Sequence, residues 1–209
     1  MSIRHHPSDE TLFRYATGIL PPGPALVIAT HLGFCPLCRH INRGLTSVAG
    51  RMLSEEEPEA MAAGALADTL ARLDQPAPEG TRPRPNHADL PAPLAAAEIA
   101  PWRWLSPGIH IAHVGPRSKQ RSVFLLRCAP GSSLPAHRHS VPEYSCVIKG
   151  SYSDAEVRYS AGDLEESQAD LSHAPTVDAG GECMAIIAVE GRLQLVGLLP
   201  RLLQPFFGI

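Results

Sequence analysis

Two cysteines and a histidine lie close together near the start of the chain, in the stretch HLGFCPLCRH at residues 31–40. His31 and Cys35 are four residues apart, so on a helix they would share one face. Pro36 suits the first turn of a second helix, and Cys38 would then lie inside that helix and point back towards Cys35. One imidazole and two thiolates are ligands for zinc, which needs a fourth donor to complete a tetrahedron.

The fourth zinc ligand can come from a pair of histidines at the start of the first expected helix. Either His6 or His5 would reach the other donors if that helix packs alongside them. The alternative is a reduced Cys-x-x-Cys pair with an incidental histidine. A thioredoxin-type redox motif requires a preceding strand in a βαβ unit, whereas the surrounding sequence predicts helices. The pattern therefore favours a zinc site over a redox site.

A second group of candidate ligands lies in the C-terminal half of the chain. His137 and His139 are two residues apart, so in a strand both would project to the same face. Glu143 follows after a turn, and His173 adds a third imidazole further along. Three imidazoles and one carboxylate on the inward faces of a small barrel would bind zinc or another divalent transition metal, such as iron, manganese or nickel.

The residues around the first ligand group favour helix. Apolar residues at the three- and four-residue spacing of a helix, with Ser8 as the N-cap, predict a first helix at residues 8–20. Three further helical segments follow at residues 24–32, 36–53 and 58–74. Together they predict a small helical domain over residues 1–74.

The C-terminal half has the composition of strands and turns. Residues 75–93 contain six prolines and almost no large apolar side chain, which predicts an extended linker rather than a packed element. Short β-rich segments punctuated by turn residues follow at residues 108–114, 121–129, 143–153, 155–163 and 182–191. They predict an antiparallel sandwich or small barrel over residues 94–209. The expected fold class is therefore multidomain α + β.

Charge and composition exclude several classes of function. The net charge of −3 disfavours direct binding to nucleic acid. No stretch approaches the roughly 18 apolar residues of a membrane span, and the polar N-terminus lacks a signal-peptide core, so we expect a cytoplasmic protein with reduced thiols.

The five cysteines have no disulfide-framework spacing. Cys128 and Cys146 are expected in the core, whereas Cys183 is a candidate for either a core residue or an oxidant-sensing thiol.

Both ligand groups resemble known families. The opening IRHHPSDETLFRYATG, followed by His31, Cys35 and Cys38, resembles the zinc-binding anti-sigma domain. This resemblance implies that His6 is the remaining zinc ligand, with His5 in reserve, and that four helices clamp an extracytoplasmic-function sigma factor. The segments at residues 131–150 and 162–173 are similar to the two cupin motifs. The second motif departs from the usual pattern at Gln168, Asp170 and Val177.

The combination of a zinc-binding helical domain, a proline-rich linker and a cupin resembles the ChrR family of anti-sigma factors. The resemblance implies a 1:1 complex with a sigma-E-type sigma factor, which is released in response to singlet oxygen or related oxidative stress. It implies negative regulation of transcription without catalytic residues. The helical domain would hold the sigma factor, and the cupin would carry the response.

Two other functions compete with this hypothesis. One is a cupin metalloenzyme of the dioxygenase type with the zinc domain as an accessory, since three histidines and a glutamate can hold a redox-active metal. The altered second cupin motif and the absence of an evident acid–base pair disfavour it. The other is a regulator whose cupin binds a small molecule instead of sensing an oxidant. Binding of a sigma factor would separate the first hypothesis from the enzyme.

Overall fold

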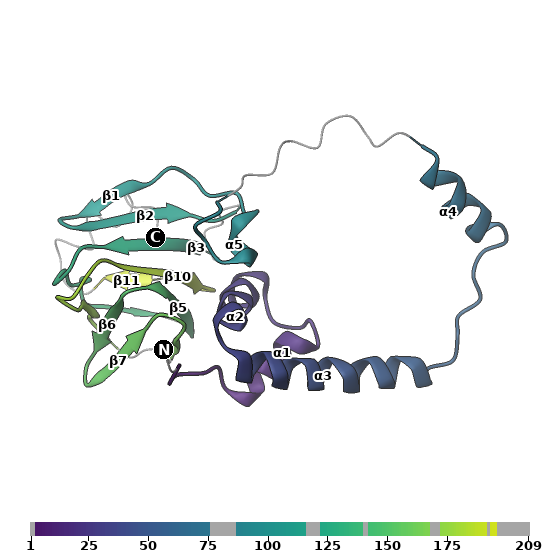
Figure 1. Cartoon of the computed structure of the whole chain (residues 1–209), viewed down its shortest axis with the longest axis horizontal. Helices are drawn as coiled ribbons and strands as arrows, with labels where there is room; N and C mark the ends of the chain where they lie inside the picture. The colour runs from purple at the N-terminus through teal and green to yellow at the C-terminus, as the bar shows by residue number, and fades with distance from the viewer. Residues whose placement is uncertain are drawn as a thin grey trace.

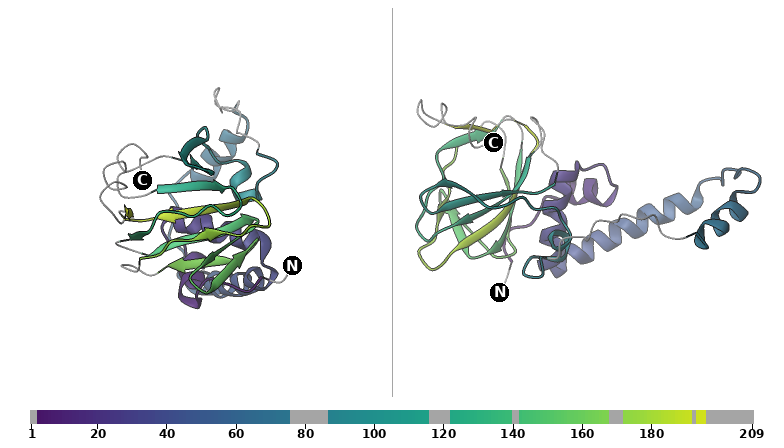
Figure 2. Two further views of the ribbon diagram at one scale, coloured as in Figure 1. Left: turned by 90° about the vertical axis from the view of Figure 1, so that its left-hand side faces the viewer. Right: turned by 90° about the horizontal axis from the view of Figure 1, so that it is seen from above.

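The structure is a computed structural model, and it describes residues 3–75, 87–115, 122–139, 142–167, 172–191 and 193–195. The strands curl into a barrel-like body, and the N-terminal helices pack against one side of it (Figure 1). The third helix points away from this body, and the fourth lies beyond its far end (Figures 1 and 2). This arrangement agrees with the expected fold class, a helical N-terminal part and an all-β cupin.

The described helices are α1 (Asp9–Ala16), α2 (Pro22–Phe34), α3 (Pro36–Glu55), α4 (Ala65–Leu73) and the single turn α5 (Ala92–Ala95). Ser8 caps α1 as expected, because its hydroxyl accepts a hydrogen bond from the Thr11 amide at 3.2 Å. Helix α4 is shorter than the predicted segment 58–74, since Gly64 adopts φ +85° immediately before it. None of the described helices is long and apolar enough to cross a bilayer.

The described strands form three antiparallel sheets. The largest has the order β1 (Arg103–Ser106), β2 (Ile109–His113), β3 (Ser122–Cys128), β10 (Cys183–Val189), β5 (Glu143–Lys149) and β8 (Leu164–Ser167). A second has the order β7 (Val157–Ser160), β6 (Ser151–Asp154) and β9 (Thr176–Val177), and the third pairs β11 (Leu193–Leu195) with β4 (His137–His139). The two longer sheets enclose an apolar core that includes Val147, Tyr152 and Ile187.

Helix α2 joins the helical part to the cupin. Its sequence is apolar on all sides, which is typical of a helix buried on all sides. It contacts α1 and α3 on the helical side and α5, β5 and β10 on the cupin side. Val27 and Ile28 are fully buried in one cluster with Leu125 and Ile186 of the sheet. The helical part and the cupin therefore share a continuous core.

Most of the predicted linker lies outside the described residues, which omit 76–86. The described end of the linker is packed, because α5 places the fully buried Leu94 in the same cluster as α2. The proposed boundaries at residues 74 and 94 stay a prediction.

The shared core predicts that the two parts unfold together. Replacing Ile28 by alanine removes a fully buried side chain and is expected to lower the free energy of unfolding by about 2–5 kcal/mol. The control Leu53→Ala alters a side chain that is 75% exposed, and a change within about 0.5 kcal/mol is expected. The measurement is denaturant unfolding followed by tryptophan fluorescence, since both tryptophans lie in the cupin part. A tryptophan transition unaltered by Ile28→Ala would contradict the shared core.

Candidate metal centres

The first candidate metal centre brings together His6, His31, Cys35 and Cys38, with one ligand atom of each within 4.8 Å of the others. Cys35 ends α2 and caps α3, and its Sγ accepts a hydrogen bond from the Cys38 amide at 3.4 Å. The Nδ1 atom of His6 lies 3.5 Å from the Cys35 sulfur and 3.4 Å from the Cys38 sulfur. Helix α2 thus carries one donor, the α2–α3 junction a second and the first turn of α3 a third, while the segment before α1 supplies the fourth.

His31 is oriented towards the cysteines by a contact with the cupin. Its Nδ1 donates a hydrogen bond to the Gly162 carbonyl at 2.8 Å, which leaves Nε2 on the opposite side of the ring. This Nε2 is buried and has no hydrogen-bond partner among the described residues. A buried acceptor beside two sulfur atoms and a second imidazole fits a metal ion, because a ligating histidine normally fixes its other nitrogen on a carbonyl or carboxylate.

The electrostatics of this group also suit a cation. Burial lowers the pKa of His31 to about 4, which keeps the imidazole neutral and able to ligate. Burial, together with Cys35, raises the pKa of Cys38 to about 12. Two thiolates in this position would therefore need a compensating positive charge. The donor set, two thiolates and two imidazoles, is that of a closed structural zinc site.

His5, the reserve candidate, does not lie in the donor group. Its ring lies 4.6 Å from that of Tyr159 in β7, and its backbone is hydrogen-bonded to the cupin. His6 and His5 point differently because they are adjacent in an extended segment. Spacing alone left both histidines open and the family resemblance implied His6; in the structure it is the His6 imidazole that lies beside the two sulfur atoms.

The second candidate centre consists of His137, Glu143 and His173 at the barrel sheets. The backbones of His137 and His173 form an antiparallel bridge with hydrogen bonds of 3.1 and 3.0 Å, and their rings are 4.3 Å apart. His137 donates from Nδ1 to the Pro135 carbonyl at 2.8 Å. An Nδ1 anchored on a carbonyl in this way is typical of a histidine that ligates a metal through Nε2.

Two carboxylates that sequence reasoning missed lie beside His173. Asp154 Oδ2 is 2.6 Å from His173 Nδ1, and Asp154, Glu165 and His173 have ligand atoms within 4.8 Å of one another. Tyr152 donates a short hydrogen bond to Glu165. Strand alternation places Asp154 on the face of Tyr152, but nothing local indicates that this face lines the barrel. Asp154 is suited to orient the His173 ring, in the way that a carboxylate orients a metal-ligating histidine.

Glu143 is buried at the start of β5 and lies among other acids. Burial, with the nearby charges of Glu165 and Asp154, raises its pKa to about 8. A group of carboxylates and imidazoles in the barrel fits a divalent cation, which would favour ionised Glu143.

Some of the predicted residues fall outside what the structure describes. The backbone of His139 pairs with Leu193, but its side chain is not among the described ones. Its place in the barrel group therefore stays a prediction. Gln168 and Asp170 lie outside the described residues, and Val177 is buried in β9.

The three cupin cysteines are buried. Cys128 and Cys183 face each other across β3 and β10, and Cys146 is fully buried in β5. Burial raises the pKa of Cys128 to about 11 and that of Cys146 and Cys183 to about 12. Because oxidants react with accessible thiolates, these environments disfavour Cys183 as a sensor and suit core packing.

Comparison with known proteins covers the whole chain. Residues 93–191 match the ChrR cupin-like domain family. The anti-sigma-E factor ChrR of Cereibacter sphaeroides is 37% identical over 217 residues, which span 100% of both chains. The crystal structure of Rhodobacter sphaeroides SigE in complex with the anti-sigma ChrR matches with 34% identity and a TM-score of 0.77, covering 90% of this chain and 100% of that chain.

The two donor groups predict about two metal ions per chain in the purified protein. Cys38→Ser removes a thiolate donor from the first group, and His137→Ala removes an imidazole from the second, so each variant is expected to retain about one ion. Elemental analysis of the wild type and both variants provides the measurement. A wild-type content near one ion would show that one group does not bind metal.

The environment of Glu143 predicts a pH dependence for the metal-free protein. The folded chain keeps the proton of Glu143 up to about pH 8, whereas the unfolded chain loses it near pH 4.5, so unfolding releases a proton between these values. The free energy of unfolding therefore falls as the pH rises, by about 1 kcal/mol between pH 7 and pH 8.

Denaturant unfolding in the presence of a chelator measures this effect, with Glu143→Gln as the control, because the glutamine does not titrate. The difference between the two slopes isolates Glu143 from other titrating groups. Equal slopes for both proteins would contradict the assignment.

Proposed function

Since this chain belongs to the ChrR family of anti-sigma factors, we propose that it sequesters an extracytoplasmic-function sigma factor of the sigma-E type, in a 1:1 complex, and so represses transcription. The relative of known structure is itself bound to SigE. Family membership favours a regulator over the dioxygenase-like enzyme, since the relative aligned over its full length is an anti-sigma factor.

The observation that carries this proposal is an uncovered apolar stripe on α3. Leu37, Ile41, Val48 and Met52 recur at helical spacing and are 36–64% exposed. Helix α4 carries a second such stripe with Leu66, Leu70 and Leu73, which are 53–78% exposed. Both helices lie away from the barrel (Figure 1). Amphipathic helices with uncovered apolar faces are typical of protein-binding surfaces.

The N-terminal metal, proposed to be zinc, would fix the base of this surface. Its donors belong to the segment before α1, to α2 and to the α2–α3 junction, so one ion would set the angle at which α3 leaves the body. Short helices with a small core of their own benefit most from such a cross-link. The helical part over residues 1–74 would thus bind the sigma factor.

The cupin part over residues 94–209 is proposed to carry the response to singlet oxygen or related oxidants. Its barrel group is proposed to hold zinc or another divalent transition metal through His137, His139, Glu143 and His173. To release the sigma factor, the signal must stabilise the unbound form relative to the complex by a few kcal/mol. It can do so only if it acts differently on the two forms. We further propose that the protein acts in the cytoplasm, where its partner meets RNA polymerase.

The apolar stripe on α3 predicts a site-specific loss of partner binding. Met52→Asp places a charge in the stripe and is expected to weaken binding of the cognate sigma factor by roughly 30-fold or more, because a carboxylate would be buried without a partner. Thr46→Asp is the matched control, since it adds the same charge on the opposite, exposed face of α3.

Calorimetric titration of the purified sigma factor with the zinc-loaded full chain measures both variants. Circular dichroism checks that the helices are retained. Equal affinity for Met52→Asp and Thr46→Asp would exclude the stripe as the contact surface. Failure of the wild-type protein to bind any sigma factor from its own organism would exclude the proposed function.

A further inference from the structure

The segment that carries His6 is clamped to the cupin by one carboxylate. Asp163 lies in the turn between β7 and β8 and is 2% exposed. Its Oδ1 accepts hydrogen bonds from the backbone amides of Arg4 at 2.7 Å and His5 at 3.0 Å. The Leu164 amide donates to the His5 carbonyl at 3.1 Å. The backbone immediately before His6 is therefore fixed on the cupin.

The same turn supports the second imidazole of the first metal group. The Gly162 carbonyl accepts the Nδ1 hydrogen bond of His31. Gly162 has φ +92°, and a Cβ at this position would lie 2.9 Å from Ile3 and 3.1 Å from Phe34. Only glycine allows the turn to approach both the N-terminal segment and the end of α2 this closely.

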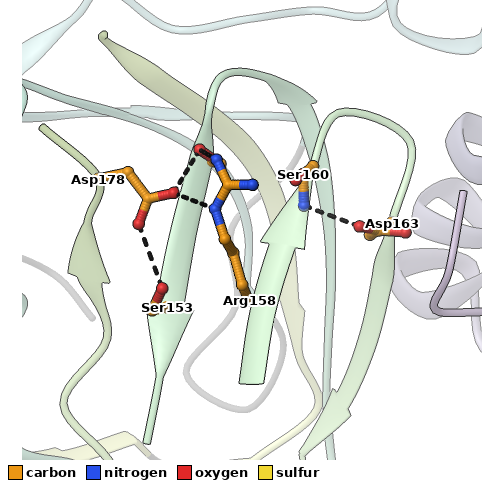
Figure 3. A network of polar contacts seen from close by, with 6 residues as sticks. Ser153, Arg158, Ser160, Asp163 and Asp178 are labelled. Carbon is orange, nitrogen blue, oxygen red and sulfur yellow. Dashed lines mark hydrogen bonds and ion pairs between the residues drawn. The ribbon is translucent and has the colours of Figure 1, made fainter. Parts of the chain in front are cut away.

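The turn itself is firmly held in the barrel. Asp163 Oδ2 accepts a hydrogen bond from the Ser160 amide at 2.8 Å, which closes the turn (Figure 3). The backbone of Val147 in β5 pairs with Gly162 and Asp163 through hydrogen bonds of 2.8 and 3.1 Å. A turn that is anchored in the barrel thus contacts His31 directly. It also contacts Arg4 and His5, the two residues before His6.

We propose that the Gly162–Asp163 turn of the cupin is a structural part of the N-terminal metal site, with Asp163 as a positioning residue for His6 and Gly162 for His31. The inference rests on metal binding at His6, His31, Cys35 and Cys38, and it does not require a sigma factor. Groups that orient a ligand in this way typically contribute a factor of 10–100 to metal affinity. The N-terminal metal is then held jointly by both parts of the chain.

A chain of side-chain contacts also runs from His5, beside the first metal group, to the barrel group. The His5 ring contacts the Tyr159 ring in a tilted arrangement at 4.6 Å, and the Tyr159 ring stacks on Tyr152 at 5.2 Å. Tyr152 donates to Glu165, which follows the turn by two residues and belongs to the acidic group at His173. A displacement at the barrel group therefore has a contiguous route to the residues that hold His6.

The test compares two carboxylates of the same barrel, which Figure 3 shows at opposite ends of the network of polar contacts. Asp178 accepts hydrogen bonds from Ser151, Ser153 and Arg158, whereas Asp163 holds the N-terminal segment. Asp163→Ala is expected to weaken metal binding at the cysteine site by about 10–100-fold. The control Asp178→Ala, which also removes side-chain hydrogen bonds from the barrel, is expected to leave that affinity within about 2-fold.

Titration of the full chain with Co²⁺ in competition with a chelator gives the affinity. The thiolate-to-cobalt absorption band reports on the cysteine site alone, because the barrel group contains no cysteine. The barrel ion, counted by elemental analysis, shows that each variant is folded. If Asp163→Ala does not fold, Asp163→Asn and Asp178→Asn replace the pair, with a smaller loss expected for Asp163→Asn.

Equal affinity for the Asp163 and Asp178 variants would overturn the inference while leaving metal binding and the proposed function intact. Absence of the thiolate band in the wild-type protein would overturn it together with the metal assignment. Sigma-factor binding, measured separately, decides the proposed function.

Discussion

The contact between α2 and the large sheet is the constraint on which the rest of the structure depends. It buries a mainly apolar helix against β5 and β10, and it brings His31 within hydrogen-bonding distance of Gly162. Without this contact α2 would expose a wide apolar face, and His31 would lose the carbonyl that orients it. Packing and metal-site geometry are therefore set by one interface.

Burial has the same electrostatic effect in the two candidate metal centres. In each, burial raises the pKa of an acidic candidate ligand, Cys38 in the first centre and Glu143 in the second, and so favours its neutral form. A bound cation would favour the ionised form of the same group. Strand β8 lies between the centres, since Glu165 belongs to the barrel group while Glu166 accepts a hydrogen bond from the Ser8 amide at 3.0 Å. One strand thus contacts the barrel group and the start of α1.

Apolar surface is distributed unequally among the helices. Helix α2 uses most of its apolar residues for the internal core, whereas α3, apart from Cys38 and Leu45, and α4 leave most of theirs exposed. The proposed binding surface is consequently built on the helices that contribute least to the core of the described residues. Helix α2, the segment around His6 and the start of α1 all contact the cupin, and they link it to α3.

The sequence by itself determined what depends on local geometry. Helical spacing placed His31 beside Cys35, and a proline at N1 placed Cys38 one turn further; the alternation of β-rich segments indicated the barrel. Only the tertiary structure decided that His6 rather than His5 meets the sulfur atoms, that Asp154 joins His173, and that the two parts share a core. These contacts join residues that are far apart along the chain. The positions of their side chains depend on how the elements pack together, and short-range periodicity in the sequence does not encode that packing.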